Sequence, residues 1–301
     1  METNILLENG TNELEVLEFT LAGNSYGINV AKIREIITYQ PVTPVPNAHP
    51  SIEGIFMPRD KMITAIDLRN CLQRGESEPE GLFIITNFNG LDIAFHVDTV
   101  VGIHRVSWTE IIKPDSTVSN SEEGVSTGII KKNNKLIIIL DFEKIVTDIN
   151  PETGLKVQEI EEMGERSRND TPILIAEDSA LLNKLIVESL NKAGYVNLTH
   201  TENGQQAWDL LCEWRDTGVL EKKVQCIITD IEMPQMDGHR LTKLVKEDDI
   251  LKAIPVIIFS SLINTEMRRK GEQLGADAQL TKPEIGNLVR TIDNVLGIQG
   301  D

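Results

Sequence analysis

The spacing of apolar and polar residues changes near the middle of this 301-residue chain. Up to about residue 149, short runs alternate apolar with polar positions, which is the period of half-buried antiparallel strands. The predicted strands are Val16–Leu21, Ser25–Val30, Met62–Asp67, Leu82–Phe88, Leu91–Val97 and Lys135–Leu140. Residues 31–37 fit a short helix or a strand, and Asn89-Gly90 is typical of a hairpin turn. This half is predicted to form one small β-barrel or a pair of them, with one or two helices.

After residue 171, short apolar strands alternate with amphipathic helices. The predicted strands are 172–176, 197–201, 225–229, 256–259 and 278–281, and the predicted helices are 180–190, 204–215, 238–246, 265–274 and 285–296. Ser179 stands where it could cap the first helix. Five such units predict a doubly wound parallel sheet. Residues 151–170 are rich in acidic side chains and offer little to bury, so they are predicted to be a linker.

Composition narrows the class of protein. The net charge of -18 and the lack of a polybasic run argue against nucleic acid or anionic lipid as a partner. The start of the chain lacks a signal-peptide pattern, and no apolar run approaches the ~20 residues of a membrane span, so no direct membrane insertion is expected. Three widely separated cysteines form no CxxC pair. A reducing cytoplasm is therefore the expected location.

Polar and charged side chains follow four of the five predicted strands of the second half, at the point where each strand ends. Glu177-Asp178 follows the first strand, Asp230 the third, Ser260 the fourth and Lys282 the fifth. In a doubly wound sheet these ends meet in one crevice. Three carboxylates there would repel one another without a cation, and Mg²⁺ favours carboxylate ligands and phosphate oxygens. The sequence therefore predicts a magnesium-assisted phosphoryl-transfer site.

The predicted roles follow from the chemistry of each group. Asp230 is the expected nucleophile, forming an aspartyl phosphate. Lys282 and Mg²⁺ would neutralise the incoming oxygens, and Ser260 would donate a hydrogen bond to one of them. Simpler alternatives stay open, because an Asp at a strand end is commonly a helix cap or a solvated group, and Ser260 could serve only as a cap.

This set resembles the receiver domains of two-component signalling, with a flavodoxin-like (CheY-like) fold. The matching residues are Glu177-Asp178, the stretch 230–238, Ser260 and Lys282-Pro283, and Lys282 stands 52 positions after Asp230. The resemblance implies that Glu177, Asp178 and Asp230 bind the metal and that Glu232 lends its backbone carbonyl. Two departures stand out. Gln279 occupies the position of the usual switch aromatic, and the segment Cys212–Val224 is longer than typical.

Two enzymatic patterns in the first half lack the context they need. Gly124-Val125-Ser126-Thr127-Gly128 matches the nucleophile elbow of hydrolases, but a strand-like run follows the serine where a helix is required. The five histidines show no metal-ligand spacing, and His96 is interpreted as a packed residue of a strand. The first half is therefore predicted to be a binding module.

The first half resembles the CheW-like coupling domain of bacterial chemotaxis, an all-β fold of two small barrels. The residues that carry the resemblance are 18–30, 54–59, 66–69, 97–102 and 136–140. Of the family's Asn-Leu-Arg-Gly turn, the stretch 57–60 keeps only Arg59, which is the predicted partner-binding residue, with a solvated loop arginine as the alternative. The expected organisation is a coupling domain at 1–150, a linker at 151–170 and a receiver at 171–298.

A coupling domain joined to a receiver resembles the CheV-type chemotaxis adaptors. The resemblance implies that the chain links methyl-accepting chemoreceptors to the histidine kinase CheA at receptor arrays on the inner face of the membrane. Phosphorylation of Asp230 would modulate that coupling and give adaptation. The alternative is a phosphate sink without structural output. The chain is expected to be a phosphoacceptor that catalyses its own phosphorylation and dephosphorylation, rather than an enzyme. A transcription regulator is disfavoured by the acidic charge.

Overall fold

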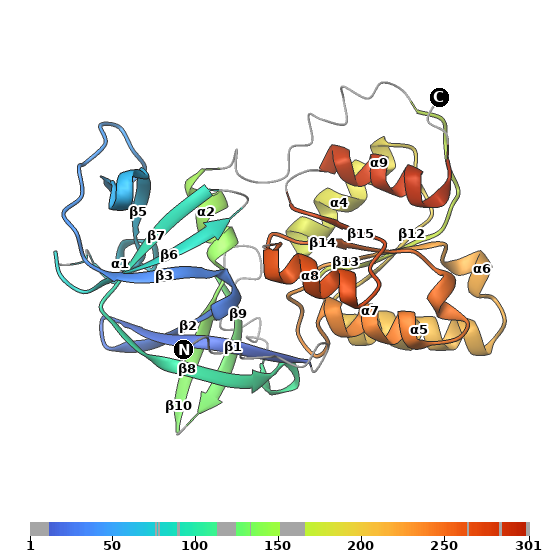
Figure 1. Cartoon of the computed structure of the whole chain (residues 1–301), viewed down its shortest axis with the longest axis horizontal. Helices are drawn as coiled ribbons and strands as arrows, with labels where there is room; N and C mark the ends of the chain where they lie inside the picture. Colours follow the sequence, from blue (N-terminus) through green and yellow to red (C-terminus); the bar gives the residue numbers. More distant parts are fainter. Residues whose placement is uncertain are drawn as a thin grey trace. The chain divides into compact units, whose positions relative to one another are not determined.

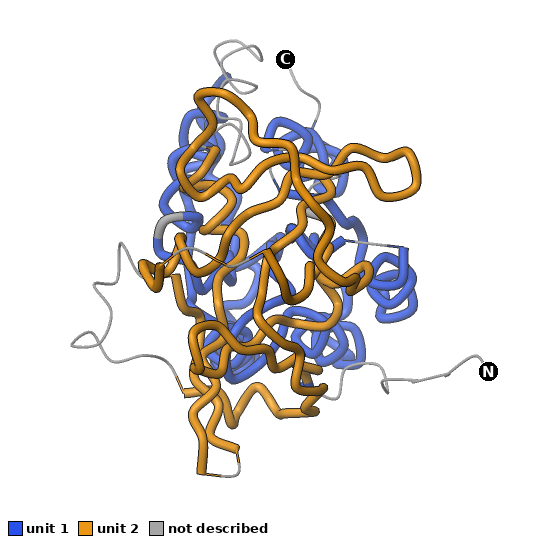
Figure 2. The backbone as a smooth tube through the Cα atoms, turned by 90° about the vertical axis from the view of Figure 1, so that its left-hand side faces the viewer, with its two compact units in different colours: residues 1–13, 154–301 blue, residues 14–153 orange. Residues whose placement is uncertain are grey.

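The computed structural model describes residues 12–75, 77, 79–88, 91–112, 125–132, 134–150, 166–263, 265–282 and 285–298. The chain divides into two compact units (Figure 2). Residues 14–153 form the coupling unit, and residues 154–301 together with 1–13 form the receiver unit. The predicted turn at 89–90 and most of the predicted linker lie outside the described residues.

The coupling unit contains two five-stranded sheets. The first has the order β8-β1-β2-β10-β9, with β1 Glu13–Leu21, β2 Asn24–Asn29, β8 Thr99–Ser107, β9 Ser126–Lys132 and β10 Lys135–Leu140. The second has the order β3-β6-β7-β5-β4, with β3 Ile33–Thr38, β4 Ile52–Phe56, β5 Ile63–Asp67, β6 Leu82–Phe88 and β7 Leu91–Val97. Most neighbouring strands run antiparallel, but β2 with β10 and β5 with β7 are parallel. The predicted all-β class is confirmed.

Short helices join these strands. They are η1 Val30–Lys32, η2 Pro58–Asp60, α1 Leu68–Cys71, η3 Trp108–Glu110 and α2 Phe142–Ile149. The two alternatives for residues 31–37 both occur in succession, because η1 ends at Lys32 and β3 begins at the next residue. Asp141 caps α2 by accepting a hydrogen bond from the backbone N–H of Lys144, which fixes where that helix begins.

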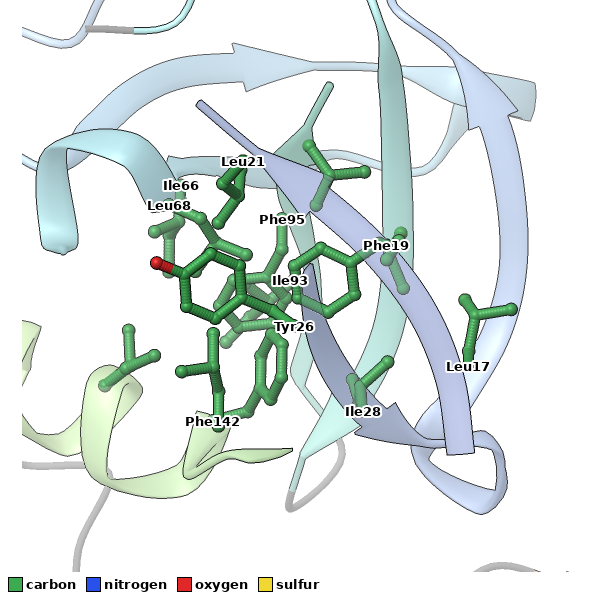
Figure 3. Packing of buried hydrophobic residues seen from close by; sticks show 14 of the residues in the cluster. Leu17, Phe19, Leu21, Tyr26, Ile28, Ile66, Leu68, Ile93, Phe95 and Phe142 are labelled. Carbon is green, nitrogen blue, oxygen red and sulfur yellow. The ribbon is translucent and has the colours of Figure 1, made fainter. Parts of the chain in front are cut away.

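Aromatic side chains from distant parts of the coupling unit share one core (Figure 3). Phe19 of β1, Phe95 of β7 and Phe142 of α2 are fully buried. The ring of Phe142 meets that of Phe95 edge-on at 4.7 Å between centroids and lies 6.2 Å from that of Phe19. Aromatic pairs of this geometry add stability beyond the area they bury. The helix α2 therefore belongs to the core of this unit.

The receiver unit is built on a parallel five-stranded sheet of order β12-β11-β13-β14-β15. Its strands are β11 Ile173–Ala176, β12 Leu198–Thr201, β13 Cys226–Thr229, β14 Val256–Phe259 and β15 Ala278–Leu280. Its helices are α4 Ala180–Lys192, α5 Gly204–Asp216, α6 Leu220–Lys223, α7 Gly238–Glu247, η5 Leu251–Ala253, α8 Thr265–Gln273 and α9 Ile285–Leu296. The predicted doubly wound parallel sheet is confirmed.

Helices cover both faces of this sheet (Figure 1). Alternate residues of each strand point to opposite faces, so Ile173 packs with α4 and α9 whereas Leu174 packs with α5 and α7. Ser179 caps α4 as predicted, and Asp237 caps α7 by accepting a hydrogen bond from the N–H of Arg240. In the described part of the chain, no helix is long and apolar enough to cross a membrane.

Candidate functional site

Strand register brings the chemically active residues to one edge of the receiver sheet. Ala176 lies opposite Thr229 in the β11–β13 pair, so Glu177 and Asp230 leave their strands side by side. On the other side, the N–H of Ser260 donates to the carbonyl oxygen of Leu280, and the N–H of Lys282 donates to the carbonyl oxygen of Ser260, at 3.0 and 3.3 Å. The sequence prediction that these groups meet at one edge is therefore matched by the geometry.

Lys282 joins the two buried carboxylates. Its Nζ lies 2.7 Å from Oε2 of Glu177 and 3.1 Å from Oδ2 of Asp230. All three side chains are at least nine-tenths buried. The other oxygens also have donors, because the N–H of Ser179 bonds Oε1 of Glu177 and the N–H of Ile231 bonds Oδ1 of Asp230. The ammonium is thus placed to neutralise charge at the carboxylate predicted to be phosphorylated.

The surroundings of Glu177 raise the pKa of its carboxyl group. Burial raises the pKa of Glu177 most strongly, the Lys282 ammonium lowers it, and the charge of Asp230 raises it, which leaves a pKa of about 7. The ammonium of Lys282 therefore offsets only part of the electrostatic cost of burying these carboxylates. A further cation at this edge would lower their electrostatic free energy.

The carboxylates fit a hard divalent cation. One oxygen from each of Glu177, Asp178 and Asp230 can be chosen so that all three lie within 4.8 Å of one another. Mg²⁺ binds through a few carboxylates, keeps several waters and bridges to phosphate oxygens. A cluster of carboxylate oxygens in which one residue, Asp178, is only half-buried therefore suits this ion. Glu232 lies two residues beyond Asp230 in the β13–α7 connection, and its role as a carbonyl ligand stays a prediction.

Two small residues, Ser260 and Gly238, lie at this edge of the sheet. Ser260 is 1% exposed, and its Oγ accepts a hydrogen bond from the N–H of Leu262 at 3.3 Å, so part of its function is a local turn contact. Gly238 begins α7, and a Cβ there would lie 1.8 Å from the carbonyl oxygen of Asp230. The sequence alone gives Gly238 no role. Its place after Asp237 at a helix start is the signal that could have revealed this close approach.

Gln279 stands inside the receiver unit. It pairs with Ile258 in the β14–β15 ladder and is 8% exposed. Its Nε2 donates to the backbone carbonyl oxygen of Arg268 in α8 at 2.7 Å. The sequence shows that this position holds no aromatic side chain, but it does not reveal the contact with α8.

The segment Cys212–Val224 is a packed extension. The helix α5 continues to Asp216, and the short helix α6 follows it. Trp214, Val219 and Leu220 pack on the core that lies beneath α5 and α7. The extra length therefore adds apolar contacts to this face of the receiver unit.

In the coupling unit, Arg59 lies in η2 between β4 and β5. Its side chain is 75% exposed and pairs with Glu35 of β3. Its backbone and that of Asp60 both adopt positive φ, at 51° and 62°, a conformation that costs a residue with a Cβ some free energy. The turn thus holds the guanidinium outward beside β3, and its partner-binding role stays a prediction.

The other candidate residues of the coupling unit, Ser126 and His96, have roles in the fold. Ser126 begins the strand β9, so no helix follows it as the hydrolase elbow requires. His96 is buried, and its ring lies 4.9 Å from that of Tyr39 and 5.1 Å from that of Phe83, centroid to centroid. Its nitrogens bond the carboxylate of Glu53 and the carbonyl oxygen of residue 80. The interpretation of His96 as a packed residue agrees with this geometry.

Two family models match this chain, one for each unit. The CheW-like domain matches residues 15–150, and the response regulator receiver domain matches residues 173–293. Relatives of similar length carry both parts. Chemotaxis protein CheV3 of Helicobacter pylori is 29% identical, with 94% of this chain and 95% of that protein covered, and CheV2 of the same organism is 29% identical, with 91% and 92% covered.

The coupling unit also has relatives that lack a receiver. Chemotaxis protein CheW of Thermotoga maritima is 28% identical, and the match covers 50% of this chain and 98% of that protein. The matches to CheV3 and CheV2 extend over nearly the whole length of this chain, whereas the match to CheW is confined to half of it. The chain therefore joins a CheW-like domain to a response regulator receiver domain, and over nearly its whole length it is similar to chemotaxis proteins named CheV.

Proposed function

We propose that this protein couples chemoreceptors to the histidine kinase CheA, and that phosphorylation of Asp230 modulates this coupling. The observation that carries the proposal is the buried cluster of Glu177, Asp230 and Lys282, in the same chain as a CheW-like domain. A phosphorylatable carboxylate and a coupling module in one chain give a scaffold whose own state can be altered. The protein would act at receptor arrays, and Arg59 would contact a partner.

The residues of the edge divide the chemistry among them. One carboxylate oxygen of Asp230 forms a bond to phosphorus while the bond from phosphorus to the histidine nitrogen of the kinase breaks. Lys282 already lies 3.1 Å from Asp230 and would neutralise the phosphoryl oxygens as negative charge gathers there. Ser260 would exchange its turn contact for a hydrogen bond to the phosphoryl group. In this proposal the chain is a phosphoacceptor and acts on no separate substrate.

Glu177 and Asp178 would hold Mg²⁺ beside Asp230. When bound, the ion supplies positive charge that stabilises the phosphoryl oxygens in the transition state. The fit rests on the three oxygens within 4.8 Å and on the burial of Glu177, which raises the pKa of its carboxyl group. Removal of Mg²⁺ with a chelator is expected to stop labelling of the protein.

Phosphotransfer is tested with CheA that carries a radiolabelled phosphoryl group. The wild-type chain is expected to take up label in the presence of Mg²⁺, whereas Asp230→Asn should remain at background. Asp249→Asn serves as a matched control, because that side chain is 96% exposed and pairs with Lys252 at the surface. Labelling of Asp230→Asn at the level of wild type would overturn the assignment.

Modulation of coupling needs a second measurement. Kinase activity is measured in receptor–kinase complexes reconstituted with wild type or with Asp230→Ala. Each protein is measured before and after exposure to phosphorylating conditions. We expect phosphorylation to change the activity with wild type and to leave it constant with the variant. If wild type becomes phosphorylated and the activity stays the same, the receiver acts only as a phosphate sink and the proposed modulation fails.

A further inference from the structure

The last five residues of the predicted linker, 166–170, are seated on the receiver unit and are called the strap below. The N–H of Asn169 donates to the carbonyl oxygen of Gly194 at 2.8 Å, and the N–H of Val196 donates to the carbonyl oxygen of Asn169 at 3.1 Å. These bonds form a parallel bridge between Asn169 and Tyr195, ahead of β11 and β12. The strap lies outside both family matches, because one ends at residue 150 and the other begins at residue 173.

Arg166, the first residue of the strap, binds an acidic residue of the last helix. Its Nη2 donates to both carboxylate oxygens of Asp293 in α9, at 2.9 and 2.8 Å. The two side chains are only 16% and 11% exposed, so salt and water screen this pair less than a pair at the surface. Hydrogen bonds between ionised groups are also stronger than those between neutral groups. The contact between Arg166 and Asp293, called the clasp, therefore holds the strap at its outer end.

Tyr195 contacts both partners of the clasp. It is fully buried between α4 and β12, and its hydroxyl donates to Oδ1 of Asp293. The guanidinium of Arg166 lies over its ring, 6.0 Å from the centroid, where a cation is attracted to the aromatic face. One carboxylate of α9 thus holds the strap and the segment after α4 together.

Gly194 leaves the space that the strap occupies. Its φ of 94° lies in the left-handed region, and a turn after a helix is enough to favour glycine there. The strap adds a second requirement, because a Cβ at this position would lie 2.4 Å from the carbonyl oxygen of Ser167. A side chain at residue 194 would therefore push the strap away from the receiver unit.

The clasp is strong but incompletely bonded. Nη1 of Arg166 is buried and has no hydrogen-bond partner among the residues that the structure describes. An unpaired buried donor costs free energy, and this cost is recovered when water reaches the guanidinium. The rest of the strap is largely at the surface, where Arg168 pairs with Asp170. The strap can therefore leave its seat without unfolding the core of the receiver unit.

We propose that the strap sets the length of the connection between the two units and that the clasp holds it in its short state. With the clasp closed, the connection ends at Arg166. With the clasp open, the five residues 166–170 join the connection and can extend it by about 17 Å. A longer connection lowers the effective concentration of one unit at the other, so the clasp sets how often the two units can meet. This device does not depend on phosphorylation of Asp230.

Hydrogen–deuterium exchange on the full chain measures opening of the strap at the amides of Asn169 and Val196. Arg166→Met keeps most of the side-chain length and removes the guanidinium. Arg166→Lys keeps the charge but lacks the planar group that binds both carboxylate oxygens. Arg168→Met is the matched control, because that arginine stands in the same strap, is 74% exposed and pairs with Asp170, which is 71% exposed.

In Arg166→Met, exchange at both amides should rise by roughly tenfold or more, as expected for the loss of a buried charged hydrogen bond. Arg166→Lys should lie between this variant and wild type, and Arg168→Met should match wild type. Exchange in β13 and β14 should stay constant, because only the strap opens. Equal exchange at the strap in Arg166→Met and Arg168→Met would overturn the proposal. An equal rise in β13 and β14 would also overturn it, because the clasp would then stabilise the whole unit.

Trypsin provides a second measurement, because it cuts the bond after Arg168 fastest when the strap has left its seat. Cleavage there, identified from the masses of the fragments, should be faster in Arg166→Met than in wild type, with Arg166→Lys between them. Equal rates of cleavage in wild type and Arg166→Met would show that the strap stays seated without the clasp. The connection would then have a single length, and the proposal would be wrong.

Discussion

The edge of the receiver sheet that holds Asp230 buries charged groups in a different way from the coupling unit. In the coupling unit, each buried ionisable group is satisfied by close neighbours: Glu18 accepts hydrogen bonds from Ser25 and from the ring of His104, and Asp67 caps α1 and holds Ser77. At this edge of the receiver unit, Glu177 and Asp230 share the ammonium of Lys282, and a third carboxylate, Asp178, lies beside them. Charges of the first kind stabilise the fold, whereas an excess of one sign leaves a site that gains from a ligand.

The difference follows from strand direction. In a parallel sheet all strands end at one edge, so residues far apart in sequence collect there. In the largely antiparallel sheets of the coupling unit, neighbouring strands end at opposite edges, and polar groups at those ends stay apart. A binding function in such a unit must therefore rest on exposed turns such as the one that holds Arg59. The predictions below test this contrast between the two units.

Loss of Lys282 is expected to have the largest effect. In Lys282→Met, Glu177 and Asp230 lose their buried partner, so without Mg²⁺ the free energy of unfolding of the receiver unit should fall by about 3–5 kcal/mol. Added Mg²⁺ should restore more stability to the variant than to wild type. Lys184→Met, at a 72% exposed position of α4, should stay within about 0.5 kcal/mol.

Urea unfolding of the full chain, followed by exchange in receiver peptides, measures this difference. A Lys282→Met protein as stable as Lys184→Met would contradict the view that the receiver edge holds unbalanced charge.

A smaller loss is expected at Gly238. The Cβ of Gly238→Ala would collide with the carbonyl oxygen of Asp230, so α7 or the Asp230 backbone must move, at a cost of about 2–3 kcal/mol. Gly102→Ala in β8 of the coupling unit is the matched control, because nothing lies within 4 Å of its added Cβ. Thermal unfolding compares the two. Equal melting temperatures would show that the close approach at Asp230 is not a constraint.

The sequence reveals much of the receiver because its signals are local. Val256–Phe259 and Ile285–Leu296 are predicted with the observed bounds, since the first is an apolar run between Pro255 and Ser260 and the second has apolar residues at helical spacing. In the coupling unit, β8 escapes prediction as a whole strand because most of its residues are exposed or half-buried and it contains Gly102, His104 and Arg105. Its place is decided by pairing within the sheet, which leaves little trace in composition.

The candidate site likewise contains features that the sequence predicts and features that it does not. Glu177, Asp230, Ser260 and Lys282 can be predicted because strand ends converge in any parallel sheet. The close contact between the Gln279 amide and Gly271 of α8 cannot be predicted, because it depends on how closely two elements approach. A lone glycine in a helical stretch is a weak signal, and it says nothing about which side chain fills the space.

A pH-dependent contribution is expected from His96 in the coupling unit. Burial lowers its pKa, but hydrogen bonds to Glu53 and to the carbonyl of Glu80, with the charges of Glu53 and Asp67, outweigh burial and raise the pKa above its ordinary value. The stabilisation is therefore fully present below pH ~6.5, the pKa of an unperturbed histidine, and is lost as pH rises through the raised pKa.

His96→Phe keeps a ring between Tyr39 and Phe83 and removes the titration. Exchange in β6 and β7 should slow in wild type as pH is lowered from 8 to 6, after correction for intrinsic rates, and should change less in the variant. His200→Phe, at an exposed position of β12 in the receiver unit, should leave the profile of β6 and β7 as in wild type. If His96→Phe shows the same pH profile as wild type, His96 does not cause the pH dependence.

The smallest effect on stability is expected at Arg59. Its ion pair with Glu35 is exposed, so Arg59→Ala should change the free energy of unfolding by less than about 1 kcal/mol. Arginine at an interface can nevertheless supply much of the binding energy, so affinity for receptor–kinase complexes should fall by roughly tenfold. Arg74→Ala, an exposed arginine beyond α1, should leave affinity unchanged. Co-sedimentation measures both. If the two variants bind alike, the turn that holds Arg59 is only a solvated loop, and the coupling unit must bind through another of its surfaces.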